Sequence, residues 1–212
     1  MRQNAAFSNK KFNKETPLRI QKLARVLIAA CLALPLWATA EVTVSGMKYE
    51  ETADLRGSKL VLNGVGTRYK GPFKVYTAGL YLTKKVGSTE EVLALPGAKR
   101  MTVIMLRDID ASELGKLFVR GVEDNMDRAA MVKLIPGLMR MSQIFSDHKH
   151  LKSGEQFLID WVPGTGTIVT VRGVPQGEPF KEPEFFNALM RIWLGPVPAD
   201  WKLKDALLGK PA

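Results

Sequence analysis

Residues 62–82 read LNGVGTRYKGPFKVYTAGLYL, and this stretch decides the fold class. Its second half, residues 73–82, is rich in aromatic and β-branched side chains, lies between Gly71-Pro72 and a lysine pair, and predicts a central strand. Apolar and polar residues alternate over residues 59–69, which predicts a second strand directly before it. The stretch therefore predicts two consecutive strands that meet at a glycine–proline turn.

The sequence around this pair completes the pattern of an α+β fold. Further strands are expected at residues 42–44 and 100–106, and a hairpin at residues 156–162 and 167–174 around a glycine-rich turn. Caps, length and apolar stripes predict the helices, at residues 89–95, from Asp110 onward, 131–145, 184–194 and 200–208. Strands followed by helices, a hairpin and more helices indicate an antiparallel sheet covered mainly on one face, rather than alternating βαβ units.

The first forty residues predict a cleaved export signal. Basic residues precede an apolar run at residues 26–38, and the small-residue ending Ala38-Thr39-Ala40 predicts cleavage after Ala40, leaving a domain of residues 41–212 in the periplasm or medium. The apolar run is shorter than the ~20 residues of a spanning helix, so no stable membrane span is expected after cleavage. Residues 28–31 resemble a lipobox ending at Cys31, but the apolar stretch before that cysteine is short and much apolar sequence follows it.

Charge and cysteine content exclude several classes of function. The sequence has 31 basic and 21 acidic residues, and the predicted signal contains seven of the basic residues and one of the acidic ones. The remaining domain therefore has 24 basic and 20 acidic residues, a net charge of +4. That charge makes no basic stripe, so a nucleic-acid partner is not expected. Cys31 is the only cysteine, so the domain is expected to have no disulfide, thiolate metal site or cysteine nucleophile.

Arg68 is the first candidate for ligand binding. The strand period of two places it on the same side as Leu60, Leu62, Gly64 and Gly66. The two glycines would leave open space beside the guanidinium, whose fork is suited to a carboxylate or an enolate. The alternative is that Arg68 lies near the strand end and projects into water or pairs with an acid.

Thr77 and Asn125 are two further polar candidates on apolar elements. Thr77 is the one polar residue on its side of the third strand, although threonine is also simply a good strand former. Asn125 lies on the apolar stripe of the helix after Asp110, where an unpaired buried amide would cost about 1–3 kcal/mol. Its partner is either a backbone carbonyl or a ligand.

Other catalytic and metal-binding patterns are absent from the sequence. His148 and His150 flank a lysine in a polar segment that is expected to be a solvated loop. No HExxH motif, P-loop, Gly-x-Ser-x-Gly elbow or dinucleotide fingerprint occurs. We therefore expect no metal and no cofactor.

Several of these segments together resemble the chalcone isomerase superfamily, and in particular its bacterial exported branch. Residues 62–68 and 73–82 carry most of the resemblance, and Arg107-Asp108-Ile109, Ile135-Pro136-Gly137 and residues 192–198 extend it to roughly residues 42–209. The resemblance implies an open-faced β-sandwich, in which helices lie on a large antiparallel sheet and a ligand cleft lies between the two.

The resemblance also implies which residues line that cleft. Arg68, Thr77 and Asn125 match three catalytic positions of the plant enzymes. Phe118 stands where those enzymes have a tyrosine, and Phe186 or Asn187 stands where a further hydroxyl is expected, so the catalytic pattern is incomplete. The expected ligand-binding positions are Arg68, Thr77, Phe118, Asn125, Phe186 and Asn187.

Three functions remain open at this point. The resemblance favours an exported protein that binds a small amphipathic ligand, such as a fatty acid or a phenolic acid, with an arginine at its polar end. The first alternative is an isomerase of the intramolecular lyase type, which closes a ring by internal Michael addition while the protein orients the substrate and stabilises the enolate. The second is a non-catalytic envelope interaction protein.

Overall fold

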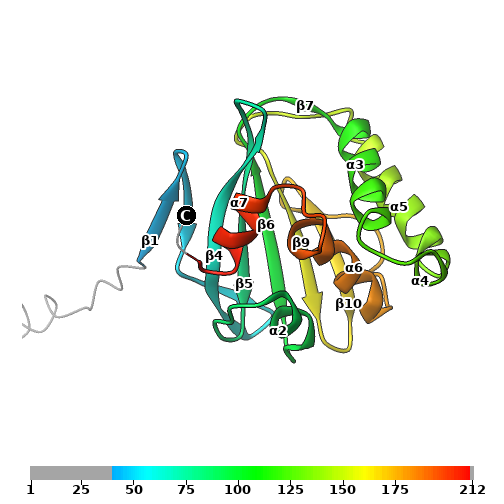
Figure 1. Ribbon diagram of the computed structural model, residues 1–212, viewed down its shortest axis with the longest axis horizontal. Coiled ribbons are helices and arrows are strands. Elements are labelled where there is room, and N and C mark those ends of the chain that lie inside the picture. The colour runs from blue at the N-terminus through cyan, green and yellow to red at the C-terminus, as the bar shows by residue number, and fades with distance from the viewer. Residues whose placement is uncertain (1–39, 211–212) are drawn as a thin grey trace, which may run out of the picture. The chain divides into compact units, whose positions relative to one another are not determined.

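A seven-stranded antiparallel sheet organises the computed structural model, which describes residues 40–210 within the unit Thr39–Ala212 (Figure 1). The predicted export signal and Cys31 lie outside the described residues. In spatial order the strands are β11 (Val174–Pro175), β10 (Gly166–Val171), β9 (Gln156–Val162), β6 (Lys99–Met105), β5 (Phe73–Leu82), β4 (Ser58–Lys70) and β3 (Thr52–Leu55).

Helices cover one face of this sheet, as Figure 1 shows for α6 and α7. They are α2 (Thr89–Ala94), α3 (Ala111–Glu123), α4 (Arg128–Val132), α5 (Ile135–Ser146), α6 (Pro183–Leu194) and α7 (Trp201–Leu207). The α+β architecture predicted from the sequence is confirmed. Within the described residues, no helix is long and apolar enough to cross a bilayer.

Local chemistry sets where these helices begin. The Asp110 carboxylate accepts hydrogen bonds from the backbone N–H groups of Ser112 and Glu113 and so caps α3, as the sequence predicts. The single helix expected over residues 131–145 is instead two helices, because Pro136 is tolerated only in the first turn and α5 therefore starts anew beside it.

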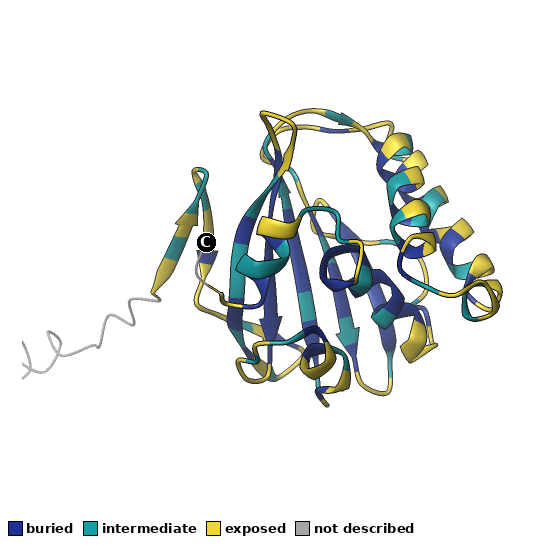
Figure 2. Cartoon of the chain, in the orientation of Figure 1, coloured by how far each residue is buried: buried dark blue, intermediate teal, exposed yellow. Residues whose placement is uncertain are grey.

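A small hairpin covers part of the opposite face of the sheet. Strands β1 (Glu41–Val44) and β2 (Met47–Glu50) pair with each other and contact β4. Figure 2 shows this hairpin mostly exposed, and the sheet strands mostly buried. Tyr49 of β2 is the exception, because it packs into a second apolar cluster with Leu60, Leu62 and Tyr81. A further short pair, β7 (Ile109–Asp110) with β8 (His150–Leu151), lies at the start of α3.

A β-bulge at Asn63 changes which residues of β4 face the helices. Leu62 pairs with Tyr81 and Gly64 pairs with Leu80, so Asn63 is the extra residue between them. A single inserted residue moves everything after it to the other face. The expectation that Leu60 and Leu62 share a face with Arg68 is therefore wrong, since both leucines face the β1–β2 hairpin.

Gly64 and Gly66 make room for α7. A Cβ atom on Gly64 would overlap the backbone carbonyl oxygen of Ala206, and one on Gly66 would lie 2.7 Å from the Ala206 Cβ. The Asn63 side chain secures the same contact, because its Nδ2 donates to the carbonyl oxygen of Leu207 at 2.7 Å. The space that the sequence leaves open beside Arg68 is thus partly occupied by a helix, which forms one side of the site.

Candidate functional site

A cleft of about 360 Å³ opens between the end of β4, the start of β5 and the helices α3 and α6. This volume falls in the range of small-molecule sites, about 300–1,000 Å³. The residues that line it are Arg68, Tyr69, Lys70, Tyr76, Leu114, Leu117, Phe118, Arg120, Gly121, Asp124, Phe157, Ile192, Trp193, Val197, Pro198 and Ala199.

Arg68 supplies a half-buried cation to this cleft. It pairs with Tyr76 across β4 and β5, and its guanidinium carbon lies 5.3 Å from the centroid of the Tyr76 ring. The Nε atom is buried and has no hydrogen-bond partner, and among residues 40–210 no carboxylate lies within ion-pair distance of the guanidinium. Leaving such a charged donor unpaired is costly, so the position favours an anion beside it.

The Tyr76 hydroxyl is a second donor next to Arg68. Burial raises the pKa of Tyr76, so the phenol stays protonated at neutral pH. Its oxygen accepts a hydrogen bond from the Trp193 indole Nε1 at 2.9 Å. Indole and guanidinium groups can only donate, so neither neighbour accepts the hydroxyl proton of Tyr76.

The negative charge of Asp200 also raises the pKa of the neighbouring Tyr76. Its carboxylate is already engaged as the cap of α7. One oxygen accepts from the backbone N–H of Tyr69 at 2.8 Å, and the other from those of Lys202 and Leu203 at 2.8 and 3.1 Å. The polar end of the cleft therefore holds an excess of donors, an arrangement suited to a carboxylate or an enolate oxygen.

Phe118 contributes to the apolar part of the cleft, as the resemblance implies. It is buried, stacks on Phe145 with ring centroids 5.0 Å apart, and meets Phe157 and Trp193 edge-on at 5.8 and 5.9 Å. Such a cluster presents an aromatic wall rather than a hydroxyl.

Thr77 does not line this cleft. Successive residues of a strand point to opposite faces, so Thr77 faces the β1–β2 hairpin while Tyr76 faces the helices. The buried Tyr49 hydroxyl donates to the Thr77 Oγ1 at 2.8 Å. The Thr77 hydroxyl is thus bound within the smaller apolar cluster.

Asn125 lies behind the wall of the cleft and binds backbone groups. Its Nδ2 donates to the carbonyl oxygens of Gly121 and Val197, both at 2.8 Å, and its Oδ1 accepts from the N–H of Val197 at 2.8 Å. Gly195 is required beside it, since a Cβ there would overlap the Asn125 Oδ1. Of the two partners that the sequence left open, the structure shows the backbone one, and Asn125 joins α3 to the segment after α6.

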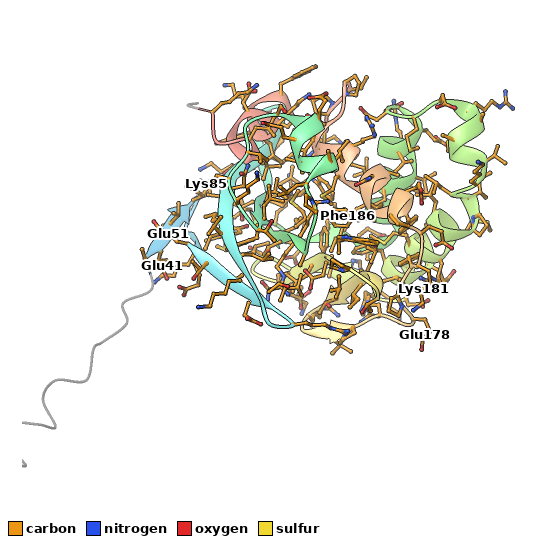
Figure 3. All side chains as sticks on the ribbon, turned by 90° about the horizontal axis from the view of Figure 1, so that it is seen from below. Glu41, Glu51, Lys85, Glu178, Lys181 and Phe186 are labelled. Carbon is orange, nitrogen blue, oxygen red and sulfur yellow. The ribbon has the colours of Figure 1, made fainter. Side chains whose placement is uncertain are left out.

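Phe186 and Asn187 also lie away from the cleft lining. Phe186, labelled in Figure 3, is buried between α6 and the sheet, 6.1 Å from the Trp161 ring and 5.7 Å from the Lys99 Nζ. Burial lowers the pKa of Lys99. Asn187 is half-buried on the same helix. Of the six expected positions, the structure brings Arg68 and Phe118 together in the cleft.

Tyr76 and Trp193 are the site residues that sequence reasoning missed. Neither stands out by its pattern, since Tyr76 falls within the predicted strand at residues 73–82 and Trp193 within the predicted helix at residues 184–194. A tyrosine hydroxyl and an indole N–H normally need a partner when buried, which is the signal that could have singled them out. The histidines stay outside: His148 Nε2 lies 3.1 Å from the Gln176 side chain, and within residues 40–210 no three potential metal ligands gather.

Comparison with known proteins identifies the family and supports the fold. The sequence profile of the chalcone isomerase-like family matches residues 41–209. The chain belongs to the chalcone isomerase-like family. Among solved structures, a fatty-acid binding protein of Arabidopsis thaliana is similar with a TM-score of 0.64 and 15% identity, over 80% of this chain and 96% of that one. No curated protein matches the sequence.

Membership in the chalcone isomerase-like family confirms the fold expected from the sequence, an open-faced sheet with helices on one side. At 15% identity the plant protein shows a shared fold alone. For this chalcone isomerase-like chain, the roles of individual residues therefore rest on the distances and burial given above.

Proposed function

We propose that the protein binds a small amphipathic acid, such as a fatty acid or a phenolic acid, in the cleft beside Arg68. The observation that carries the proposal is the meeting of donors at its polar end: the buried Nε of Arg68 has no partner, and the Tyr76 hydroxyl lies between two groups that only donate. A carboxylate accepts hydrogen bonds from both donors and balances the arginine charge.

The rest of the cleft suits the apolar part of such a ligand. Leu114, Phe118 and Ile192 supply buried aliphatic and aromatic surface, and each buried CH₂ of a ligand is worth about 0.8 kcal/mol. The fatty-acid binding protein that shares the fold supports this class of ligand. We place the protein outside the cytoplasm, because its first forty residues have the composition of a cleaved export signal.

Calorimetry with dodecanoate and dodecanol tests the proposal. The acid should bind at least tenfold more tightly than the alcohol, and Arg68→Gln should remove most of that difference. Arg128→Gln, a change at an exposed arginine on α4, is the matched control and should bind as the wild type does. Equal affinities for acid and alcohol would contradict the proposal.

N-terminal sequencing of the protein isolated from its host tests the export step separately. The expected first residue is Glu41, because cleavage after Ala40 follows from the small side chains at positions 38 and 40. A chain that retains Met1 would contradict cleavage but would leave the ligand proposal intact.

An intramolecular lyase is the second candidate, because the same donors would stabilise an enolate. Two of the three positions that the resemblance made catalytic speak against this candidate, since the Thr77 and Asn125 side chains bind protein groups and neither residue lines the cleft. Loss of the enone absorbance of a chalcone, followed with wild type and Arg68→Ala, separates the two functions. If the protein accelerates this reaction and Arg68→Ala does not, the protein is a lyase. If the wild type gives no acceleration, ligand binding remains the proposed function.

An envelope interaction protein is the third reading. Native mass spectrometry of protein isolated from its host distinguishes it, because a carrier should retain a bound acid of defined mass. Protein isolated without any such mass, and without affinity for added dodecanoate, would favour an interaction role over ligand binding.

A further inference from the structure

The mouth of the cleft carries large apolar side chains exposed to solvent. Phe73 and Trp201 are each 60% exposed, Val197 is 55% and Tyr69 is 41% exposed. Aromatic side chains of this size are usually covered, and a group of them marks an interaction surface. The four therefore need a common explanation.

These residues are neighbours around the cleft, linked by strand pairing, by shared lining of the cleft and by the cap of α7. Lys70 pairs with Phe73 where β4 turns into β5, and Tyr69, Lys70 and Val197 line the same cleft. The backbone N–H of Tyr69 also binds the Asp200 carboxylate, which caps the helix that starts at Trp201. We call this group the cleft-mouth surface; it comprises Tyr69, Lys70, Phe73, Lys74, Arg107, Val197 and Trp201.

The polar part of the cleft-mouth surface is basic. Lys70, Lys74 and Arg107 are exposed, and among residues 40–210 none of them forms an ion pair. The Arg107 guanidinium lies 5.3 Å from the Phe73 ring centroid, and the Lys204 amine lies 5.2 Å from that of Trp201. Cations thus lie directly beside the exposed rings.

The acids of this region are engaged elsewhere. Asp108 accepts a hydrogen bond from the backbone N–H of Ser153 at 2.9 Å, and Asp124 lies 3.6 Å from the Arg120 guanidinium. Asp200 caps α7. Asp108 and Asp200 keep their charge, but Lys70, Lys74, Arg107 and Lys204 outnumber them, so the aromatic surface has a positive balance.

We propose that the cleft-mouth surface docks onto a bilayer that contains anionic lipid. Aromatic side chains favour the boundary between headgroups and hydrocarbon, and lysine and arginine are attracted to anionic headgroups. Docking in this way would open the cleft toward the hydrocarbon, from which an amphipathic acid enters. Entry of the acid from the bilayer rests on the proposed function, whereas membrane docking rests on the exposure and charge of these side chains.

A second exposed apolar group provides the control. Val132, Ile135 and Met139 lie on α4 and α5, which do not line the cleft and which Figure 1 shows across α3 from α7. They are aliphatic, and Met139 is 69% exposed, which makes Met139→Ser a matched loss of exposed apolar surface.

Vesicle sedimentation tests the docking proposal with protein isolated from its host. Vesicles of phosphatidylcholine that contain about 30% phosphatidylglycerol should bind at least tenfold more protein than vesicles of phosphatidylcholine alone. The double variant Phe73→Ser/Trp201→Ser and the charge variant Lys74→Glu/Arg107→Glu should each lose at least tenfold, whereas Met139→Ser should match wild type. Equal binding to both vesicles, or wild-type binding by either cleft-mouth variant, would overturn the proposal.

Tryptophan fluorescence supplies a second readout. Trp201 is exposed while Trp193 is buried and Trp161 half-buried, so the anionic vesicles should shift the emission to shorter wavelength, and Trp201→Phe should abolish the shift. If the surface instead binds an acidic protein, the chain should not bind the vesicles, and this result would also overturn the proposal. Dodecanoate affinity without vesicles should be unchanged in Phe73→Ser/Trp201→Ser, so docking and ligand binding fail independently.

Discussion

Tyr76 and Thr77 are neighbours on β5, yet their hydroxyls lie on opposite faces of the sheet in opposite surroundings. On the hairpin face, donors and acceptors are matched: the Tyr49 hydroxyl donates to Thr77 at 2.8 Å, and Arg100 binds both oxygens of Asp160 at 2.6 and 2.8 Å. On the helix face, the Arg68 Nε has no partner and Tyr76 lies between donors. Matched polar groups stabilise the fold, whereas the unmatched donors that line the cleft point to a ligand.

The ion pair of the hairpin face provides the largest expected effect. Asp160→Ala leaves the mostly buried Arg100 guanidinium without its partner, and should lower the free energy of unfolding by about 3–5 kcal/mol. Thermal or urea unfolding measures this loss. Asp205→Ala, which removes an exposed pair with Lys210, should cost less than about 1 kcal/mol. If the two variants lose similar amounts of stability, the buried pair does not stabilise the fold more than the exposed pair, contrary to this account.

Gly64 tests how α7 closes the helix face. In Gly64→Ala the new methyl group would overlap the Ala206 carbonyl, so α7 must shift and stability should fall by about 1–3 kcal/mol. Gly87→Ala is the control, because a Cβ there meets no atom within 4 Å. Equal melting temperatures for the two variants would show that α7 does not depend on this contact.

Thr77→Val and Tyr76→Phe form a pair that separates the two faces. Thr77→Val removes the acceptor of the buried Tyr49 hydroxyl, so it should cost about 1–2 kcal/mol of stability and leave dodecanoate affinity unchanged. Tyr76→Phe removes a ligand donor and should weaken dodecanoate binding severalfold. Calorimetry and unfolding of both variants check this, and a loss of affinity in Thr77→Val would return Thr77 to the list of ligand-binding residues.

Replacing Lys99 gives the smallest effect, and the size of that effect depends on pH. Burial holds the folded pKa of Lys99 below the unfolded value of about 10.4. The penalty for its charge is complete below the folded pKa and disappears as pH rises through the folded and then the unfolded pKa. Lys99→Met should therefore raise the melting temperature at pH 7, with a gain that shrinks by pH 11. A gain that is constant with pH would contradict this origin.

The sequence predicted the architecture well because its signals are local. The alternation of β4, the composition of β5 and the Asp110 cap each involve residues close in sequence, and the structure confirms all three elements. The family resemblance added the position of a cleft. These signals sufficed for the fold class and for Arg68 as a candidate.

The site could be predicted only in part, because its geometry depends on contacts between distant segments. Counting by twos along β4 fails at Asn63, where the bulge reverses the faces, and the register shifts again between Arg68 and Tyr69. The partner of Asn125 lies 72 positions away, at Val197. Neither the bulge nor that partner leaves a periodic trace in the sequence.

The central claim is that Arg68 and Tyr76 bind the carboxylate of an amphipathic acid inside the cleft. A ¹³C NMR titration of dodecanoate labelled at its carboxyl carbon and bound to the protein measures this directly. The bound carboxyl should titrate well below the pKa of the same carboxyl group free in water and return toward that value in Arg68→Gln. A bound carboxyl that titrates at or above the ordinary pKa in the wild-type protein would contradict the account.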